Sequence, residues 1–396
     1  MKRRPALPWL LVIILSALLI ISALGVLAAT TFHTAQPTAP PVTETAPTTS
    51  APTGAGVVTS PTPDPQSTPE TKGKSSRGEE PMSAAAQSAR PGQGPLPSDH
   101  PVSCPAPTKT VSTAADLESA LANAVAGDVI ALADGTYPGN FSTKNSGAAS
   151  NRIYLCGGPG AVLDAGGNNN GYVFHLDSAS YWVLSGFTVR NGQKGIVTDS
   201  STGSVIEDLT VTDVGDEAIH LRKNSSSNLV TGNTITRTGS KNPKFGEGIY
   251  VGTAVSNWCT ISDCHTDQSN YNIIANNTIS HTTAENIDIK EGTIGGVIKN
   301  NHLDGTGMTD ATAWINVKGN AWTIDSNDGQ NSPGDGYQTH NILQDWGDYN
   351  LFTHNSGPVG GPGYGVALRP AMHNTVSCSN TLTARSGLAT IACTNT

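Results

Sequence analysis

One short pattern recurs through the second half of this chain. It starts with an acidic or small residue, continues as an alternation of apolar and polar residues, and ends on a basic or polar residue. The copies return at intervals of about 20 to 40 residues, a period that predicts a stack of similar coils. They read EAIHLR (217–222), EGIYVG (247–252), ENIDIK (285–290), AWINVK (313–318), DGYQTH (335–340) and YGVALR (364–369). In such a stack, equivalent positions form columns along one face.

The first 29 residues predict a signal peptide or a membrane anchor. Basic residues at positions 2–4 precede an uncharged apolar run over 9–29, which is long for a cleaved signal and long enough to span a bilayer. Small residues near Ala29 leave cleavage open. The basic start places the N-terminus inside, so the rest of the chain is expected to be extracellular, either secreted or surface-anchored, and to meet the membrane only through this segment.

Residues 30–103 are rich in Pro, Thr, Ser, Ala and Gly, and they hold more than half of the chain's 25 prolines. Such a composition offers too little apolar surface to offset the entropy of ordering, so we expect a disordered linker. The folded domain is then 104–396, and we expect a monomer.

All six cysteines follow the linker. An even number in an extracellular protein favours disulfides, although the sequence does not determine their pairing and structural thiols are the alternative. Closeness favours Cys259 with Cys264 and Cys378 with Cys393, which leaves Cys104 with Cys156. No Cys/His spacing suggests zinc. The net charge of −9 and the lack of a basic helix argue against nucleic acid as a partner.

A short helix followed by strands is expected at the start of the domain. Thr113 with Asp116 forms a plausible N-cap, Leu117, Leu121 and Val125 share one helical face, and glycine closes the helix at 127. Strands are expected over 129–132 and 153–155.

Asparagines or small polar residues follow later strands at a regular spacing. The intervals between them are 24 to 28 residues, with one of 44 that indicates an insertion. Stacked asparagines tolerate left-handed turns and can hydrogen-bond from coil to coil, so a structural ladder is predicted. Its members are Asp208, Asn233, Asn277, Asn301, Asn327 and Asn355.

These features resemble the secreted right-handed parallel β-helix proteins of the pectate-lyase-like superfamily. The resemblance rests on GDVIALADGTY after the short helix, on the NNTI-type turns and on ENIDIKEGT…VIKNNHLDG, and it covers about residues 108–396. It implies an all-β, three-sided solenoid with an N-terminal capping helix. The fold also carries hydrolases, epimerases and adhesins, so it does not by itself determine the chemistry.

Alternation along each copy predicts which side chains face outward. With Ile287 and Ile289 buried, Asn286, Asp288 and Lys290 point to solvent. The inner column is expected to hold Ile219, Ile249, Ile287, Ile315 and Val366. The outer columns are expected to hold His220, Tyr250, Asp288, Asn316, Gln338 and Ala367, and beside them Arg222, Gly252, Lys290, Lys318, His340 and Arg369. A third column before the strands holds Glu217, Glu247, Glu285 and Asp335.

The column of cations suits a linear polyanion, and an acidic polysaccharide is the expected partner. The alternative is a solvated sheet face on which each Lys or Arg is paired with an acid. Trp314 and the tyrosines at 250 and 364 could stack on sugar rings, and residues 238–246 and 259–270 are candidate groove walls. The predicted substrate-binding residues are His220, Arg222, Tyr250, Trp314, Asn316, His340 and Arg369.

β-Elimination from a uronate needs a base for the C5 proton, neutralisation of the adjacent carboxylate, and help for the leaving oxygen. A lysine beside other cations has a lowered pKa, so Lys290 is the expected base and Lys318 its assistant. Carboxylates can hold a hard cation. Ca2+ is therefore the expected cofactor, with Glu247, Glu285 and Asp288 as ligands.

The constellation is most similar to the alginate lyase and chondroitinase B type of β-helix lyase. That resemblance implies Lys290 as base, Glu285 and Asp288 at calcium, and Lys318 assisting. It has two departures, since the acids of this chain stand three apart rather than at alternating positions, and the next coil supplies lysine rather than arginine. Two alternatives remain: a non-catalytic glycan-binding β-helix, and a glycoside hydrolase that uses Glu217, Glu247 or Asp335.

Overall fold

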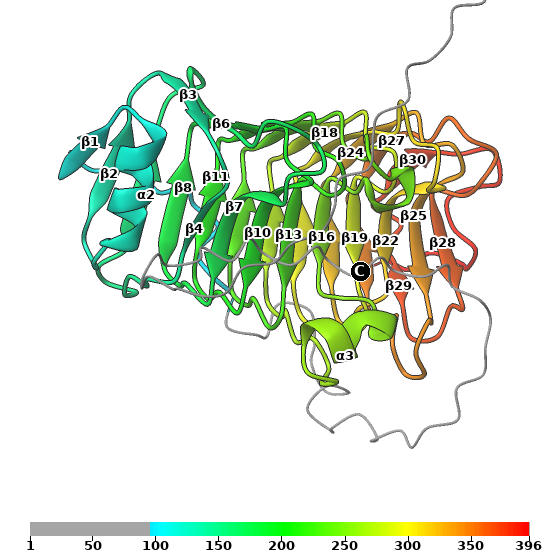
Figure 1. Cartoon of the computed structure of the whole chain (residues 1–396). Coiled ribbons are helices and arrows are strands. Elements are labelled where there is room, and N and C mark those ends of the chain that lie inside the picture. The colour runs from blue at the N-terminus through cyan, green and yellow to red at the C-terminus, as the bar shows by residue number, and fades with distance from the viewer. Residues whose placement is uncertain (1–95, 396) are drawn as a thin grey trace, which may run out of the picture. The chain divides into compact units, whose positions relative to one another are not determined.

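The computed structural model describes residues 96–395, which form a parallel β-solenoid. The chain rises through the stack as a three-sided coil, and each side contributes strands to one of three sheets (Figure 1). Sheet 1 has eleven strands, sheet 2 has nine and sheet 3 has ten. The predicted all-β parallel β-helix is confirmed.

Each of the three sheets is built from short strands. Sheet 1 contains β1 Lys109–Val111, β2 Val129–Leu132, β5 Ile153–Cys156, β8 Trp182–Ser185, β11 Val205–Glu207, β14 Leu229–Thr231, β17 Ile273–Ala275, β20 Val297–Lys299, β23 Thr323–Asp325, β26 Leu351–Thr353 and β29 Thr375–Val376. Sheet 2 contains β4 Phe141–Thr143, β7 Tyr172–Asp177, β10 Lys194–Asp199, β13 Ile219–Arg222, β16 Ile249–Val251, β19 Ile287–Ile289, β22 Ala313–Val317, β25 Asp335–His340 and β28 Val366–Arg369. Sheet 3 contains β3 Gly135–Pro138, β6 Ala161–Asp164, β9 Thr188–Arg190, β12 Thr210–Thr212, β15 Thr234–Thr236, β18 Thr278–Ser280, β21 His302–Asp304, β24 Asp328–Gln330, β27 Ser356–Pro358 and β30 Thr381–Thr383.

The register of sheet 2 matches the predicted columns. Ile219 pairs with Ile249, which pairs with Ile287 and then Ile315, and all four are fully buried. Tyr337 continues this column and Val366 follows it. The inner column is therefore a continuous apolar core.

Asparagine side chains connect the coils at the end of sheet 1. The Nδ2 atom of Asn277 donates to Oδ1 of Asn301 at 2.9 Å, and the same bond joins Asn233 to Asn277 and each member to the next as far as Asn380. Asp208 does not belong to the ladder, because Leu209 occupies its position and donates its backbone N–H to Asn233. The expectation for Asp208 was therefore wrong by one residue.

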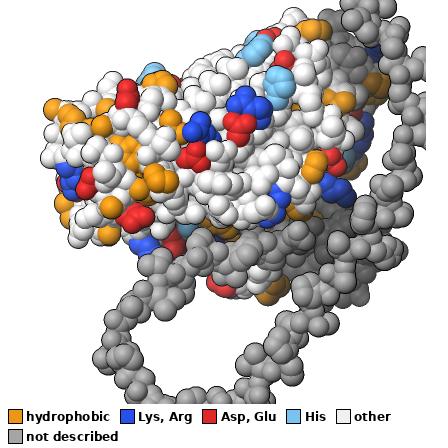
Figure 2. Space-filling model, turned by 45° about the horizontal axis from the view of Figure 1, so that its top comes forward, with side chains coloured by type: hydrophobic (Ala, Val, Ile, Leu, Met, Phe, Trp, Pro, Cys, Tyr) orange, Lys and Arg blue, Asp and Glu red, His pale blue; other side chains and the backbone are white. Residues whose placement is uncertain are grey.

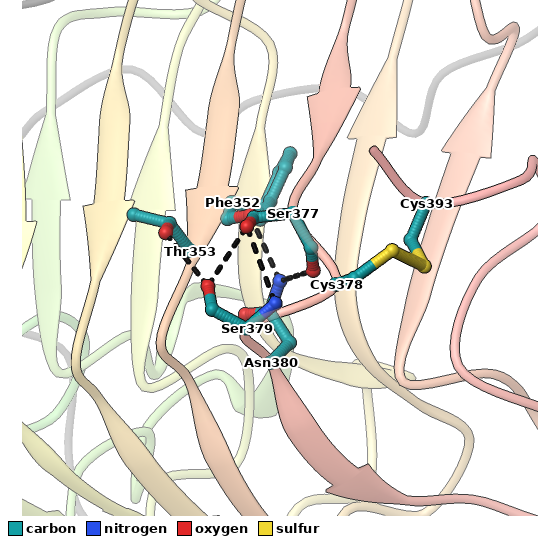
Figure 3. Close-up of a disulfide and its surroundings, with 7 residues drawn as sticks. All are labelled: Phe352, Thr353, Ser377, Cys378, Ser379, Asn380 and Cys393. Atoms are coloured by element: carbon teal, nitrogen blue, oxygen red, sulfur yellow. Dashed lines mark hydrogen bonds between the residues drawn. A yellow bond between two sulfur atoms is a disulfide. The ribbon is translucent and has the colours of Figure 1, made fainter. Parts of the chain in front are cut away.

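The N-terminal helix α2, Ala114–Ala122, is capped by Thr113, whose side chain accepts from the backbone N–H of Asp116. Leu117 and Leu121 are buried as expected, whereas Val125 lies beyond the helix and is 62% exposed. Near the other end, the Cys378–Cys393 disulfide closes the last coil beside a hydrogen-bonded group that includes Ser377, Ser379 and Asn380 (Figure 3).

The disulfides are Cys104–Cys156, Cys259–Cys264 and Cys378–Cys393, as closeness favoured. The short helices η1 Pro243–Phe245, η2 Val255–Asn257 and α3 Trp258–Ile261 lie in the excursions on either side of β16. Acidic and basic side chains form small mixed groups on the face that Figure 2 brings forward.

The segment 96–103 was expected in the linker, but it lies along the outside of sheet 1. Leu96 and Val102 pack on an apolar cluster there, and the backbone N–H of Val102 donates to Glu207 at 2.9 Å. Asp99 pairs with Lys299. The predicted signal or anchor segment lies outside the described residues, as does the linker up to residue 95. Within residues 96–395, no helix is both long and apolar enough to cross a membrane.

Candidate active-site groove

A groove of about 840 Å³ runs along sheet 2 and crosses the strands from β10 to β25. One wall comes from the excursion 238–246, which contains η1, and the other from 253–261, which contains η2 and α3. The first was expected as a wall. Of the second expected wall, 259–270, only Ile261 lines the groove, and the other lining residues of this excursion lie before it. The groove is lined by Gln193, Lys194, Asp216, Glu217, His220, Arg222, Lys241, Asn242, Lys244, Phe245, Glu247, Tyr250, Thr253, Ala254, Ser256, Asn257, Ile261, Glu285, Asp288, Lys290, Asp310, Asn316, Lys318, His340 and Ile342.

Three carboxylates meet at the centre of the groove. Glu247, Glu285 and Asp288 each place one oxygen within 4.8 Å of the others. Asp288 faces the groove from β19, while Glu247 and Glu285 stand before their strands, where the chain turns into sheet 2. Because of that turn, acids three positions apart converge, which accounts for their unusual spacing in the sequence.

Two lysines hold the third carboxylate of this cluster. The Nζ atom of Lys318 donates to both oxygens of Asp288, at 2.9 and 3.0 Å. Lys290 reaches the same carboxylate at 3.0 Å. Its ammonium also lies 5.1 Å from the ring centroid of Tyr250. The predicted catalytic and metal-binding residues are thus brought together in one place.

The carboxylates of the cluster differ in their titration. Burial, and then the charges of its acidic neighbours, raise the pKa of Glu247 well above its usual value. Burial and Asp288 likewise raise the pKa of Glu285. Burial opposes ionisation of Asp288 as well, but Lys290 and Lys318 outweigh it and lower its pKa.

The expected low pKa of Lys290 is not found. Burial by itself lowers the pKa of this ammonium group, but Asp288, Tyr250, Glu291 and Glu247 outweigh burial and raise it well above its usual value. The expectation was wrong because it counted the cations along the column and overlooked the carboxylates beneath it.

Tyr250 is a protonated phenol beside Lys290. It is 8% exposed, and burial raises its pKa well above the usual value. The ring of His220 packs edge-on against Tyr250 at 4.3 Å, while its Nε2 hydrogen-bonds to the carbonyl of Gly252 at 2.9 Å. His220 therefore packs against Tyr250 from the preceding coil.

Trp314 is not on the groove face, and that expectation was wrong. It is fully buried in the core, donates its indole N–H to the carbonyl of Gln330 at 2.8 Å and packs edge-on against Tyr337. Gly329 and Gly336 make room for it, because a Cβ on either would lie under 3.0 Å from its ring. Asn286, its equivalent one coil earlier, is also buried rather than solvent-facing, since the chain turns at this position.

The column of cations exists, but its lysines and arginines bind carboxylates of the protein. Arg222 donates to Asp199 at 2.7 Å and Arg369 pairs with Asp335, which matches the alternative of a charge-paired face. His340 lines the groove, with its Nε2 at 3.0 Å from Gln338. Arg369 and Asp335 do not line it. The column is therefore no open track for a polyanion.

Several lining residues were missed in the sequence. Lys194 belongs to a further copy of the pattern, KGIVTD in β10, whose register with β13 places Ile196 opposite Ile219. That copy starts with lysine rather than an acid, which concealed it. Asp216 resembled a turn residue, and Lys241 and Lys244 stand in an excursion without periodicity. The acid–base pattern thus identified the centre of the groove but not its ends.

The central cluster fits a hard divalent cation. Oε2 of Glu247 and Oδ1 of Asn316 are buried with no hydrogen-bond partner among the residues described. Asn316 donates through its Nδ2 to Glu285 at 3.1 Å, so its carbonyl oxygen stands at the edge of the three carboxylates. Carboxylate and amide oxygens are the donors that Ca2+ prefers.

The fold has been seen in solved structures. The chain is similar to an alginate lyase from Paenibacillus sp. str. FPU-7, with 33% sequence identity and a TM-score of 0.67, over 71% of this chain and 98% of that protein. A polygalacturonase from Erwinia carotovora ssp. carotovora has 13% identity and a TM-score of 0.52, over 75% of this chain and 99% of that enzyme. The second likeness shows the fold alone. The sequence matches no protein-family model and no curated protein.

Proposed function

This chain belongs to the pectate-lyase-like parallel β-helix family of polysaccharide-acting enzymes, and from that premise we propose that it is a lyase that cleaves a uronate-containing polysaccharide by β-elimination. The observation that carries the proposal is the cluster of Glu247, Glu285 and Asp288 against Lys290 and Tyr250 in one groove. Secretion or surface anchoring, expected from residues 1–29, is part of the proposal.

Alginate is the polyuronate to test first. The structure that shares 33% identity and nearly its full length with this chain is an alginate lyase. Alginate carries a carboxylate on every sugar unit, and the excursion 238–246 contributes the exposed cations Lys241 and Lys244 to the groove lining. This supports a polyanionic substrate over a neutral one.

Glu247, Glu285 and Asp288 would hold Ca2+, with the side-chain oxygen of Asn316 available beside them. When bound there, Ca2+ would neutralise the substrate carboxylate, which acidifies the C5 proton, and would offset the negative charge that raises the pKa of Lys290. The protein's own part is to hold three carboxylate oxygens within 4.8 Å of one another.

Lys290 is assigned as the base. Its neutral amine would take the C5 proton, the C5–H electron pair would form the C4–C5 double bond, and the C4–O4 bond would break with its electron pair leaving on oxygen. Burial already favours the neutral amine, and only the neighbouring carboxylates and Tyr250 oppose it.

Tyr250 is assigned as the proton donor to the leaving oxygen. Its phenol is protonated at neutral pH, lines the groove and lies against the Lys290 ammonium group. Lys318 binds both oxygens of Asp288 and so positions this carboxylate rather than reaching the substrate.

The test is to incubate the purified protein with alginate, other polyuronates and glycosaminoglycans, with and without a chelator. A lyase generates an unsaturated product that absorbs in the ultraviolet, and we expect this absorbance on alginate and its loss with chelator. Reducing ends without absorbance would instead indicate a hydrolase. Retained glycan without either product would indicate a binding protein.

A further inference from the structure

The N-terminal end of the groove holds a buried carboxylate that the proposed reaction does not use. Asp216 is 4% exposed and lines the groove just before β13. Its Oδ2 accepts a hydrogen bond from Gln193 Nε2 at 2.7 Å. Its Oδ1 is buried and has no hydrogen-bond partner in the described part of the chain. A buried acceptor left without a donor costs stability, so its retention calls for an explanation.

The excursion 238–246 packs directly on the backbone of Gly215 and Asp216. Lys241 donates its backbone N–H to the carbonyl of Gly215 at 2.8 Å, and the carbonyl of Asp216 accepts from Gly239 at 3.3 Å. A Cβ on Gly215 would lie 3.0 Å from Cβ of Lys241, so the two segments are in close contact. Lys241 and Lys244 are exposed and line the groove. The segment that packs on Gly215 and Asp216 thus contributes two cations to the groove lining, and the charge of Lys241 acts on Asp216.

Burial and the neighbouring polar and charged residues together set the pKa of Asp216. Burial, and then the charge of Glu217, raise the pKa of Asp216 to about 6, while the bond from Gln193 and the charges of Lys194 and Lys241 oppose this rise. Lys194 is itself paired with Glu217 at 2.8 Å. Lys241 and Lys244 are the groove cations that the excursion 238–246 contributes at this end of the cavity.

This position lies along the path that a polysaccharide would take. β13 is separated from β19, which carries Asp288, by β16 alone, and adjacent strands are about 4.8 Å apart. A sugar chain laid along the groove from the central cluster therefore reaches Asp216 within one or two sugar units.

We propose that Asp216, Lys241 and Lys244 form a distal subsite for a uronate unit two units along the chain from the one at the central cluster. Asp216 Oδ1 accepts a hydrogen bond from a sugar hydroxyl, and the two lysines bind the carboxylate of that unit. The proposal rests on the proposed function in that the same polyuronate occupies the central cluster. It adds a preference for chains long enough to span both places.

The test compares the wild-type protein with the Lys241→Ala/Lys244→Ala double variant on long alginate and on short oligomers that reach only the central cluster. We expect KM on the long substrate to rise on the order of tenfold and kcat to change less than about twofold, because two charge contacts to a bound sugar are lost. Short oligomers should show no change. Lys144→Ala is the control, since Lys144 is exposed and outside the groove.

The subsite would be overturned if the double variant changed KM equally on short and long substrates, or changed it on neither. Direct binding separates this result from a failure of the proposed function. If the wild-type protein cleaves no polyuronate, alginate retention in affinity electrophoresis is compared instead. Weaker retention of the double variant than of Lys144→Ala then supports the subsite, and equal retention or none overturns it.

Discussion

Two ion pairs on different sheets each join a basic side chain to an aspartate, but one pair is exposed to solvent and the other is buried. On the sheet 3 side, Arg237 and Asp213 meet at 2.6 Å with side chains 59% and 40% exposed. In the groove, Lys318 and Asp288 meet at 2.9 Å with side chains 7% and 2% exposed. Mixed groups of exposed charges are visible in Figure 2.

The two pairs differ in the free energy that it costs to remove their charged groups from water. An exposed pair is worth about 0–1 kcal/mol and needs no special explanation. A buried pair must offset the desolvation of both ions, and apolar replacement is often neutral or stabilising. Charges therefore accumulate in the groove for chemistry rather than for stability.

The largest effect is expected at Lys290. Lys290→Ala should lower kcat on the polyuronate by about 10²–10⁴-fold, because the base is lost. Lys290→Arg keeps a cation but cannot give up its proton, so it should be similarly inactive. Initial rates of ultraviolet absorbance measure both variants. If the arginine variant kept the wild-type rate, Lys290 would act through its charge alone.

Asp288→Asn should destabilise the fold far more than Asp213→Asn. Removing the groove carboxylate leaves Lys290 and Lys318 buried without their shared partner, which costs about 3–5 kcal/mol. The surface replacement should cost about 0–1 kcal/mol. Urea unfolding without added divalent ions measures both changes, and equal losses would remove the distinction between the two regions.

Calcium should stabilise the groove and leave the surface pairs unaffected. At a concentration about 100 times its Kd, a ligand that binds only the folded state adds about 2.7 kcal/mol to the free energy of unfolding. Glu247→Gln should abolish most of this gain because it removes one ligand. Glu118→Gln, on an exposed face of α2, is the control. Thermal unfolding with and without Ca2+ reports the effect, and a gain unchanged by Glu247→Gln would place the ion elsewhere.

The smallest effect is expected from pH. The pKa of Asp216 is raised to about 6, so this group is neutral at pH 5 and charged at pH 7. The ionised carboxylate accepts a stronger hydrogen bond from the sugar hydroxyl than the neutral acid, so KM should fall about two- to fivefold from pH 5 to pH 7. Asp216→Asn should flatten this fall. A fall of equal size in the variant would assign the pH dependence to another group.

The regular parts of the molecule were predictable because their causes are local. Alternation along β19 places Ile287 inward and Asp288 outward, as expected. The asparagine ladder followed from spacing alone, apart from Asp208. Trp314 was misplaced although it lies within β22, because alternation alone does not reveal the space that Gly329 and Gly336 leave for its ring in the core.

The sequence predicted which residues belong to the centre of the site, but not how they interact. Repeat alignment brought Glu247, Glu285, Asp288, Lys290 and Lys318 to one face, and the groove contains all five. The pKa of Lys290 could not be obtained in the same way, because it depends on the distances to several carboxylates at once. The excursion that carries Lys241 and Lys244 has no repeat equivalent, so its path was equally hidden.

The sequence by itself determined the parallel stack, its inner column and the place where acids and lysines concentrate, because backbone alternation and coil period act between near neighbours. Only the tertiary structure decided that the cations are paired, that acids three apart converge, and which residues of the excursion 238–246 line the groove. These depend on how the chain turns at each corner and on charges summed over several coils, which no single repeat encodes.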